Sequence, residues 1–169
     1  MEYWDVYDKV GNFSGRKLPK GSSFGENEYH FAVEAWLIND KHELLIQKRS
    51  DNCEILPGRW ALTTGRIIAG EDTVKGCIRE VKEELGIDIT RKDMHRLARF
   101  LREENHIIWD IFLIKNNTPI EAFSLQKEEV DSVAWISIPA FKELIKEKKV
   151  FAYAEIAEIV SLIENKIAE

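Results

Sequence analysis

Segments of two kinds alternate along this chain, and their order predicts a protein that mixes strands and helices. Long apolar stretches bounded by turn-forming residues predict β-strands. Apolar residues that recur at intervals of three and four predict helices, because this spacing places them on one stripe of the helix surface. We expect strands at residues 2–7, 30–38, 43–48, 60–64, 97–101, 106–115 and 133–137, and helices at residues 73–85, 139–149 and 152–167.

The predicted strands pair with their neighbours in sequence. Asn39 and Asp40 begin a turn between the second and third strands, which should therefore form a hairpin. Residues 97–101 and 106–115 should form an antiparallel pair. One helix interrupts the strands and two follow them, so we predict an α/β (α+β) fold with a mixed β-sheet between helices. The polar segments between these elements are expected to be loops, at residues 16–29, 50–58 and 116–125.

The helix at residues 73–85 has the clearest boundaries in the chain. Asp72 or Thr73 can cap its N-terminus, and Gly86 suits the left-handed conformation that ends many helices. Its apolar stripe consists of Val74, Ile78, Val81 and Leu85.

Three carboxylates lie on one face of this helix. Glu80, Glu83 and Glu84 stand at positions i, i+3 and i+4, where each pair of like charges destabilises a helix by roughly 0.2–0.5 kcal/mol. A hard divalent cation such as Mg²⁺, which prefers oxygen ligands, would explain the crowding. The alternative is a solvated face on which Arg79 and Glu83 form an ordinary ion pair. A glycine loop and Glu71, at fixed distances before the helix, favour the metal site.

The segment from Gly65 to Ile87 resembles the Nudix box, Gly-x5-Glu-x7-Arg-Glu-apolar-x-Glu-Glu-x-Gly-apolar, and matches it at every defined position. The resemblance implies an α/β/α sandwich with a mixed sheet between helices. It also implies an enzyme that uses a divalent metal to hydrolyse a nucleoside diphosphate linked to another group. We therefore expect Mg²⁺, or Mn²⁺ in its place, and a small-molecule diphosphate substrate.

The same resemblance assigns roles to residues of the box. Glu80, Glu83 and Glu84 would hold the metal, and one of them would take a proton from the attacking water. Arg79 and Glu71 would orient these metal-binding carboxylates.

Further residues of the expected site lie on loops and at strand ends. Gly65 would let the loop backbone pass close to the metal or the diphosphate. Arg49, at the end of a strand, would face the diphosphate; a surface ion pair is the alternative. A glutamate just before the last strand would approach the metal, with Glu129 the candidate and Glu128 its neighbour.

Two other activities remain as alternatives. The N-terminal half resembles the branch of the superfamily that includes isopentenyl-diphosphate isomerases, which need a cysteine before the box glycine and a histidine after it. Thr64 and Arg66 occupy those positions here, which disfavours an isomerase. The second alternative is a ligand-binding module without turnover, which the intact glutamates disfavour. Many Nudix members also have a glycine at the position of Thr64 and a glutamate at that of Ile68, so the resemblance does not supply a further loop-borne carboxylate here.

The length of the chain indicates the number of domains, and its net charge limits the kinds of molecule it is expected to bind. A chain of 169 residues fits a single domain, residues 1–169, with an N-terminal strand and loop at 1–29 and two C-terminal helices at 139–169. The net charge of −6 argues against nucleic acid polymers and anionic membranes. We expect a monomer or a homodimer.

Cysteine usage and the basic residues of the N-terminal loop add two expectations. Cys53 and Cys77 are the two cysteines, and the start of the chain does not resemble a signal peptide, so we expect free thiols and a cytoplasmic location. Arg16, Lys17 and Lys20 could meet phosphate, although a solvated loop is the simpler interpretation.

Overall fold

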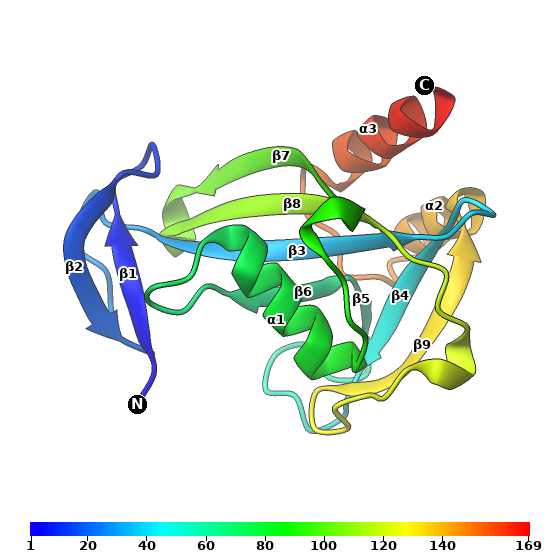
Figure 1. The fold of residues 1–169 in the computed structure, drawn as a ribbon, viewed down its shortest axis with the longest axis horizontal. Helices are drawn as coiled ribbons and strands as arrows, with labels where there is room; N and C mark the ends of the chain where they lie inside the picture. The colour runs from blue at the N-terminus through cyan, green and yellow to red at the C-terminus, as the bar shows by residue number, and fades with distance from the viewer.

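The computed structural model describes all 169 residues and contains nine strands and three helices (Figure 1). The strands are β1 (Tyr3–Tyr7), β2 (Phe13–Pro19), β3 (His30–Ile38), β4 (Glu43–Arg49), β5 (Trp60–Ala61), β6 (Thr63–Arg66), β7 (Met94–Arg102), β8 (Ile107–Lys115) and β9 (Val130–Ser137). The helices are α1 (Thr73–Leu85), α2 (Ile138–Lys146) and α3 (Ile156–Ala168). None of these helices has the length and hydropathy needed to cross a membrane.

Seven strands form one mixed sheet centred on β3. All nine residues of β3 are buried, and the strand runs parallel to β8 along its whole length. On the other side of β8, β7 is antiparallel, as predicted. β4 meets β3 only next to the turn, at Ile38 and Leu44, and then pairs with β9 for most of its length. The predicted hairpin of β3 and β4 is therefore confined to its turn, and β6 occupies the edge of β3 that β4 leaves free.

Helices cover both faces of this sheet, which confirms the predicted fold class (Figure 1). Successive residues of β3 alternate between two hydrophobic cores, because side chains along a strand point to opposite faces. Phe31 and Val33 pack in the core beneath α1, whereas Trp36 and Ile38 pack in the core beneath α2 and α3. The single helix α1 thus has one sheet face to itself.

The N-terminal segment differs from the prediction. Residues 16–29 were expected to be a loop, yet residues 16–19 belong to β2, which pairs with β1 in a separate two-stranded sheet. Six of the seven β2 residues are exposed, so the strand has no apolar alternation by which a sequence pattern could reveal it. We call residues 2–20 the N-terminal hairpin: it comprises β1, β2 and the flanking residues Glu2 and Lys20, whose backbones are joined by a hydrogen bond of 2.9 Å.

Several boundaries also differ. The last helix begins at Ile156 rather than at residue 152, because residues 150–151 run beside Trp60, whose carbonyl accepts a hydrogen bond from the Phe151 amide at 2.8 Å. The strand predicted at residues 60–64 divides into β5 and β6. β7 and β9 each begin three residues earlier than predicted, at Met94 and Val130.

Candidate active site

Helix α1 has the predicted boundaries and caps. The Asp72 carboxylate accepts a hydrogen bond from the Lys75 amide at 2.8 Å. Gly86 adopts the left-handed conformation, with a φ of 70°, and its amide donates to the Lys82 carbonyl at 3.0 Å. Val81 and Leu85 are fully buried against the sheet. The caps fix the length of the helix and the buried stripe fixes its rotation, so its glutamates are held in one orientation.

Gly65 permits the closest contact between this helix and the box loop, by which we mean residues 65–72, the end of β6 and the turn that leads into α1. A Cβ atom built at Gly65 would lie 2.0 Å from Cδ of Glu80 and 2.2 Å from its Cγ. No side chain fits between them, so the glycine is needed for the Glu80 carboxylate to lie against β6. The loop backbone thus passes close to a box carboxylate; the closer approach to metal or diphosphate expected for Gly65 stays a prediction.

Arg79 binds three of the predicted carboxylates at once. Its Nε donates to Glu71 at 2.8 Å, and its Nη1 donates to Glu80 at 2.8 Å and to Glu83 at 3.2 Å. Its Nη2 donates to the carbonyl of Arg66 at 3.0 Å. The guanidinium therefore ties the box loop to the helix and sets the direction of the three acids, consistent with the orienting role expected for Arg79 and Glu71.

The carboxylates surround a cavity of about 260 Å³ that four separate segments line. The lining residues are Glu2, Trp4 and Lys20 at the N-terminus, Arg66 and Ile68 in the box loop, Arg79, Glu80, Glu83 and Glu84 on α1, and Gln126 and Glu129 before β9. The structure thus brings all four predicted metal-binding glutamates to one cavity.

Glu84 is the least compensated of these acids. It accepts a hydrogen bond from the Gln47 amide nitrogen at 3.2 Å and forms no ion pair. Burial, aided by the neighbouring charges of Glu80 and Glu129, raises its pKa to about 8. A carboxylate that loses water without gaining a cation is costly, and a divalent ion would remove that cost.

The donor set fits a hard cation, although the side chains are not gathered around one point. No three His, Cys, Asp or Glu side chains stand close enough together to hold a metal ion. Glu80 and Glu83 turn toward Arg79, whereas Glu84 turns toward Gln47. Carboxylate oxygens are the ligands that Mg²⁺ prefers. To hold one ion between them, Glu80 and Glu83 would have to turn from Arg79 into the cavity.

Glu129 reaches the cavity because its segment is tied to the end of α1. The Ser124 amide donates to the Leu85 carbonyl at 3.0 Å, and the Gln126 amide donates to the Glu84 carbonyl at 3.0 Å. Glu129 lines the cavity, whereas its neighbour Glu128 does not. Of the two candidates, Glu129 is therefore the one that lines the cavity.

Other basic residues named from the sequence are placed differently. Arg49 donates from Nε to the Ile55 carbonyl at 2.8 Å and does not line the cavity. Arg16 is paired with Glu28, and the Lys17 ammonium lies 5.1 Å from the centre of the Tyr3 ring. Only Lys20 among the three loop cations reaches the cavity. Sequence reasoning did not single out Glu2, Trp4 or Arg66 as site residues, because their approach depends on how the N-terminal hairpin docks.

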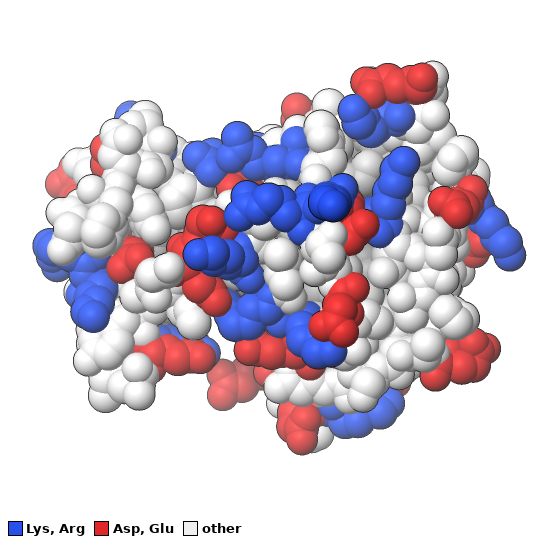
Figure 2. Space-filling view, viewed as in Figure 1, with Lys and Arg blue, Asp and Glu red and all other residues white.

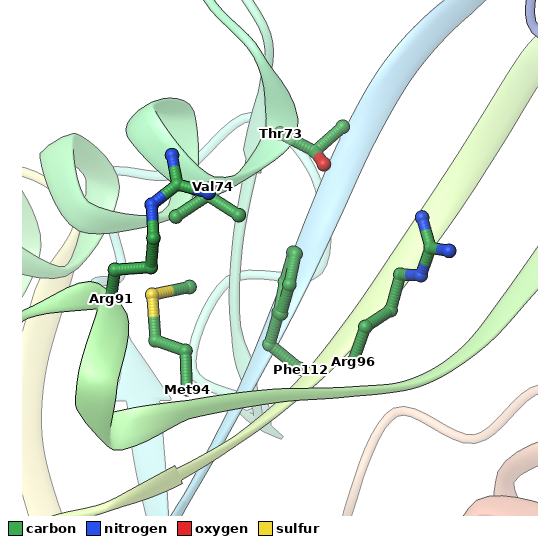
Figure 3. A pocket seen from close by; sticks show the side chains of 6 residues that line it. All are labelled: Thr73, Val74, Arg91, Met94, Arg96 and Phe112. Atoms are coloured by element: carbon green, nitrogen blue, oxygen red, sulfur yellow. The ribbon is translucent and has the colours of Figure 1, made fainter.

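A second cavity, of about 350 Å³, lies at the other end of α1 and contains none of the predicted site residues. Figure 3 shows Arg91 and Arg96 on two sides of it, with Met94 and Phe112 between them. Figure 2 shows Lys and Arg side chains gathered over α1 and β7 on this face, despite the negative net charge of the chain. Part of this charge is compensated from within, since Arg96 lies 3.7 Å from the buried Asp110.

Comparison with known proteins supports the interpretation of the box. The family model described as the NUDIX domain matches residues 28–156. Nudix hydrolase 3 of Arabidopsis thaliana is 31% identical over 159 residues, which cover 87% of this chain but only 21% of that longer protein. An uncharacterized Nudix hydrolase of Listeria monocytogenes is 28% identical over 96% of this chain and 95% of its own length. A crystal structure from Deinococcus radiodurans shares the fold, with a TM-score of 0.74, 17% identity and coverage of 95% of this chain and 98% of that chain.

Proposed function

This chain belongs to the Nudix family, and on that premise we propose that it is a metal-dependent pyrophosphohydrolase that cleaves the diphosphate linkage of a small organic diphosphate. The observation that carries the proposal is the cavity that Glu80, Glu83, Glu84 and Glu129 all line. The uncompensated Glu84 is the strongest single sign that a cation belongs there.

The residues that line the cavity would have different roles in hydrolysis. Glu80, Glu83, Glu84 and Glu129 would hold Mg²⁺ or Mn²⁺. When bound, the ion neutralises charge on the diphosphate and makes water a stronger acid. Glu80 or Glu83, turned from Arg79 into the cavity, would accept a proton from the attacking water, while Arg79 stays bonded to Glu71 and to the Arg66 carbonyl and holds the box loop against the helix.

Cleavage of the diphosphate takes one step and consumes one water molecule. The water oxygen forms a bond to one phosphorus, and the bond from that phosphorus to the bridging oxygen breaks. The bridging oxygen leaves with the other phosphate. The products are a monophosphate and a second phosphorylated compound, with no oxidant, reductant or further reactant.

The substrate class follows from charge and size. A cavity of about 260 Å³ in a chain of net charge −6 suits a small molecule rather than a nucleic acid polymer. Five glutamates and three basic residues line it, so an anionic substrate requires added cation charge before it can bind. We place this activity in the cytoplasm, consistent with the two free cysteines.

The test is a panel of nucleoside diphosphate sugars, dinucleoside polyphosphates, ADP-ribose and isopentenyl diphosphate, assayed with Mg²⁺ or Mn²⁺. We expect wild type to release phosphorylated products from at least one compound. Glu84→Gln should lower kcat by about a hundredfold or more, because the loss of a metal ligand removes several kcal/mol of transition-state stabilisation. Glu128→Gln is the matched control, since this exposed neighbour of Glu129 does not line the cavity.

Three results would contradict the proposal. Equal hydrolysis by wild type and Glu84→Gln would show that the carboxylate site is wrongly assigned. Conversion of isopentenyl diphosphate to its isomer would favour the isomerase. Tight binding of a panel compound without turnover would favour a binding module.

A further inference from the structure

The N-terminal hairpin lies outside the segment that the family model matches, yet it forms one wall of the active-site cavity. The match begins at residue 28, whereas Glu2, Trp4 and Lys20 line the cavity. The hairpin is docked on the box loop by two hydrogen bonds of 2.8 Å, from the Ala69 amide to the Tyr3 carbonyl and from the Gly70 amide to the Asp5 carboxylate. The wall is therefore held in place by the same loop that presents Gly65.

Two of the three cations in the cavity are available to an incoming anion. Arg79 is already bound by Glu71, Glu80 and Glu83. Arg66 has no carboxylate partner, although it stands in an acid-rich cavity. The Lys20 ammonium pairs at 2.8 Å with Glu2, and both side chains are more than half exposed. An exposed pair of this kind is weak and exchanges readily for a stronger partner.

The hairpin also positions Arg66. The Arg66 guanidinium lies over the Trp4 ring, 5.6 Å from its centre, and contacts Nε2 of His30. The His30 ring is stacked against both Trp4 and Phe24, with its centre 4.6 Å from the centre of each. Burial, together with the charge of Arg66, lowers the pKa of His30 to about 3. The imidazole is therefore neutral and can accept a hydrogen bond from Arg66 without competing for the anion.

We propose that the N-terminal hairpin builds a phosphate-binding arm of the active site, in which Lys20 and Arg66 bind one phosphate group of the diphosphate substrate and Trp4 positions Arg66. This inference rests on the proposed hydrolase function. The planar guanidinium offers paired donors that match two phosphate oxygens, and the ammonium adds a point charge.

The test measures binding apart from turnover. Methylenediphosphonate, a non-hydrolysable diphosphate, is titrated calorimetrically into the full chain in the presence of Mg²⁺. Arg66→Gln should raise Kd by about tenfold, the loss expected for one charge-assisted hydrogen bond, and Lys20→Gln should raise it by about threefold. Lys17→Gln is the matched control, because it removes the same charge from the same hairpin away from the cavity.

Variants of Trp4 test its positioning role. Trp4→Phe keeps a ring beneath Arg66 and should bind nearly as tightly as wild type, whereas Trp4→Leu should weaken binding as much as Arg66→Gln. The double variant of Trp4→Leu and Arg66→Gln should then be no weaker than Arg66→Gln alone, because both changes remove the same contact. If Trp4→Leu does not fold, Trp4→Met, which also removes the ring beneath Arg66, takes its place and should weaken binding as much as Arg66→Gln; wild-type binding by that variant would contradict the positioning role.

Wild-type affinity in Arg66→Gln and Lys20→Gln would overturn the inference, as would an equal loss in Lys17→Gln or a wild type that does not bind the probe. For a hydrolysed substrate, the two variants should raise KM and leave kcat unchanged, because they remove binding common to substrate and transition state. A fall in kcat alone would contradict the assignment. If Glu84→Gln hydrolyses like wild type while Arg66→Gln still loses the probe, the hydrolase site is wrong and the phosphate-binding arm stands.

Discussion

Replacing Gly65 with alanine should abolish most of the activity while leaving the chain folded. The new Cβ would lie 2.0 Å from Cδ of Glu80, which must therefore move by about 1 Å or more to reach van der Waals contact. Misplacing a catalytic group by about 1 Å can cost about a hundredfold in rate. We expect a loss of this size in kcat.

The effect of Gly65→Ala on stability should be small because two contributions oppose each other. The φ of Gly65 lies outside the left-handed region, so alanine fits the backbone and stabilises by about 0.4–1 kcal/mol through the unfolded state. Displacing Glu80 breaks its bond to Arg79, which costs about 1 kcal/mol. The melting temperature should therefore change by no more than about 4 °C.

Steady-state hydrolysis tests the predicted loss of kcat, and thermal unfolding of the same preparation tests the predicted small change in melting temperature. Gly15→Ala is the matched control: its φ of 83° makes alanine strained, nothing lies within 4 Å of the new Cβ, and the residue does not line the cavity. It should lose about 1–2 kcal/mol of stability and keep its kcat. Full activity in Gly65→Ala would refute the placement of Glu80, and loss of folding together with activity would refute the separation of the two effects.

Two further predictions concern buried carboxyl groups. Burial raises the pKa of Glu34 to about 7, although Tyr153 hydrogen-bonds to it. The unfolded chain releases this proton near pH 4.5, so Glu34 should lower the free energy of unfolding by up to about 3 kcal/mol between pH 4.5 and 7. Glu34→Gln should remove this part of the slope in urea titrations at pH 5 and 8 and leave the part contributed by Glu84, whose pKa is about 8. Asp110 is fully buried and accepts hydrogen bonds from Arg99 at 2.6 and 2.9 Å, so Asp110→Asn should cost about 3 kcal/mol in the same assay. Arg96→Gln, which removes a partner 3.7 Å from Asp110, should change stability by less than about 0.5 kcal/mol. If Arg96→Gln and Asp110→Asn lost equal stability, the assignment of Arg99 as the main partner of Asp110 would be wrong.

The sequence predicts the box helix well because its signals are local. Asp72 at the N-cap, Gly86 in the left-handed conformation and the apolar stripe ending at Leu85 each act within a turn or two of helix. The spacing of Glu80 and Glu84 then suffices to place both on one face, since helix geometry needs no tertiary information.

What the sequence could not supply is pairing between distant segments. β2 is exposed on both faces and is a strand only because β1 offers it a backbone partner. β4 leaves its sequence neighbour to pair with β9, a choice that apolar content does not encode. The basic residue chosen from the resemblance, Arg49, lies outside the cavity, whereas Arg66, at an undefined position of the box, lines it. Only the docked hairpin reveals that difference.

The backbone hydrogen bonds from Ser124 and Gln126 to the last turn of α1 hold the segment that carries Glu129 in place. The position of Glu129 therefore does not depend on the length of the loop before Ser124. Residues added between 116 and 123 would project into solvent, because the chain is recaptured at Ser124 whatever its earlier path. Closing a longer loop costs little, about 0.6 kcal/mol for each doubling of length. This region can therefore accept insertions, and with them new ligand contacts, without moving its acidic residue away from Glu84.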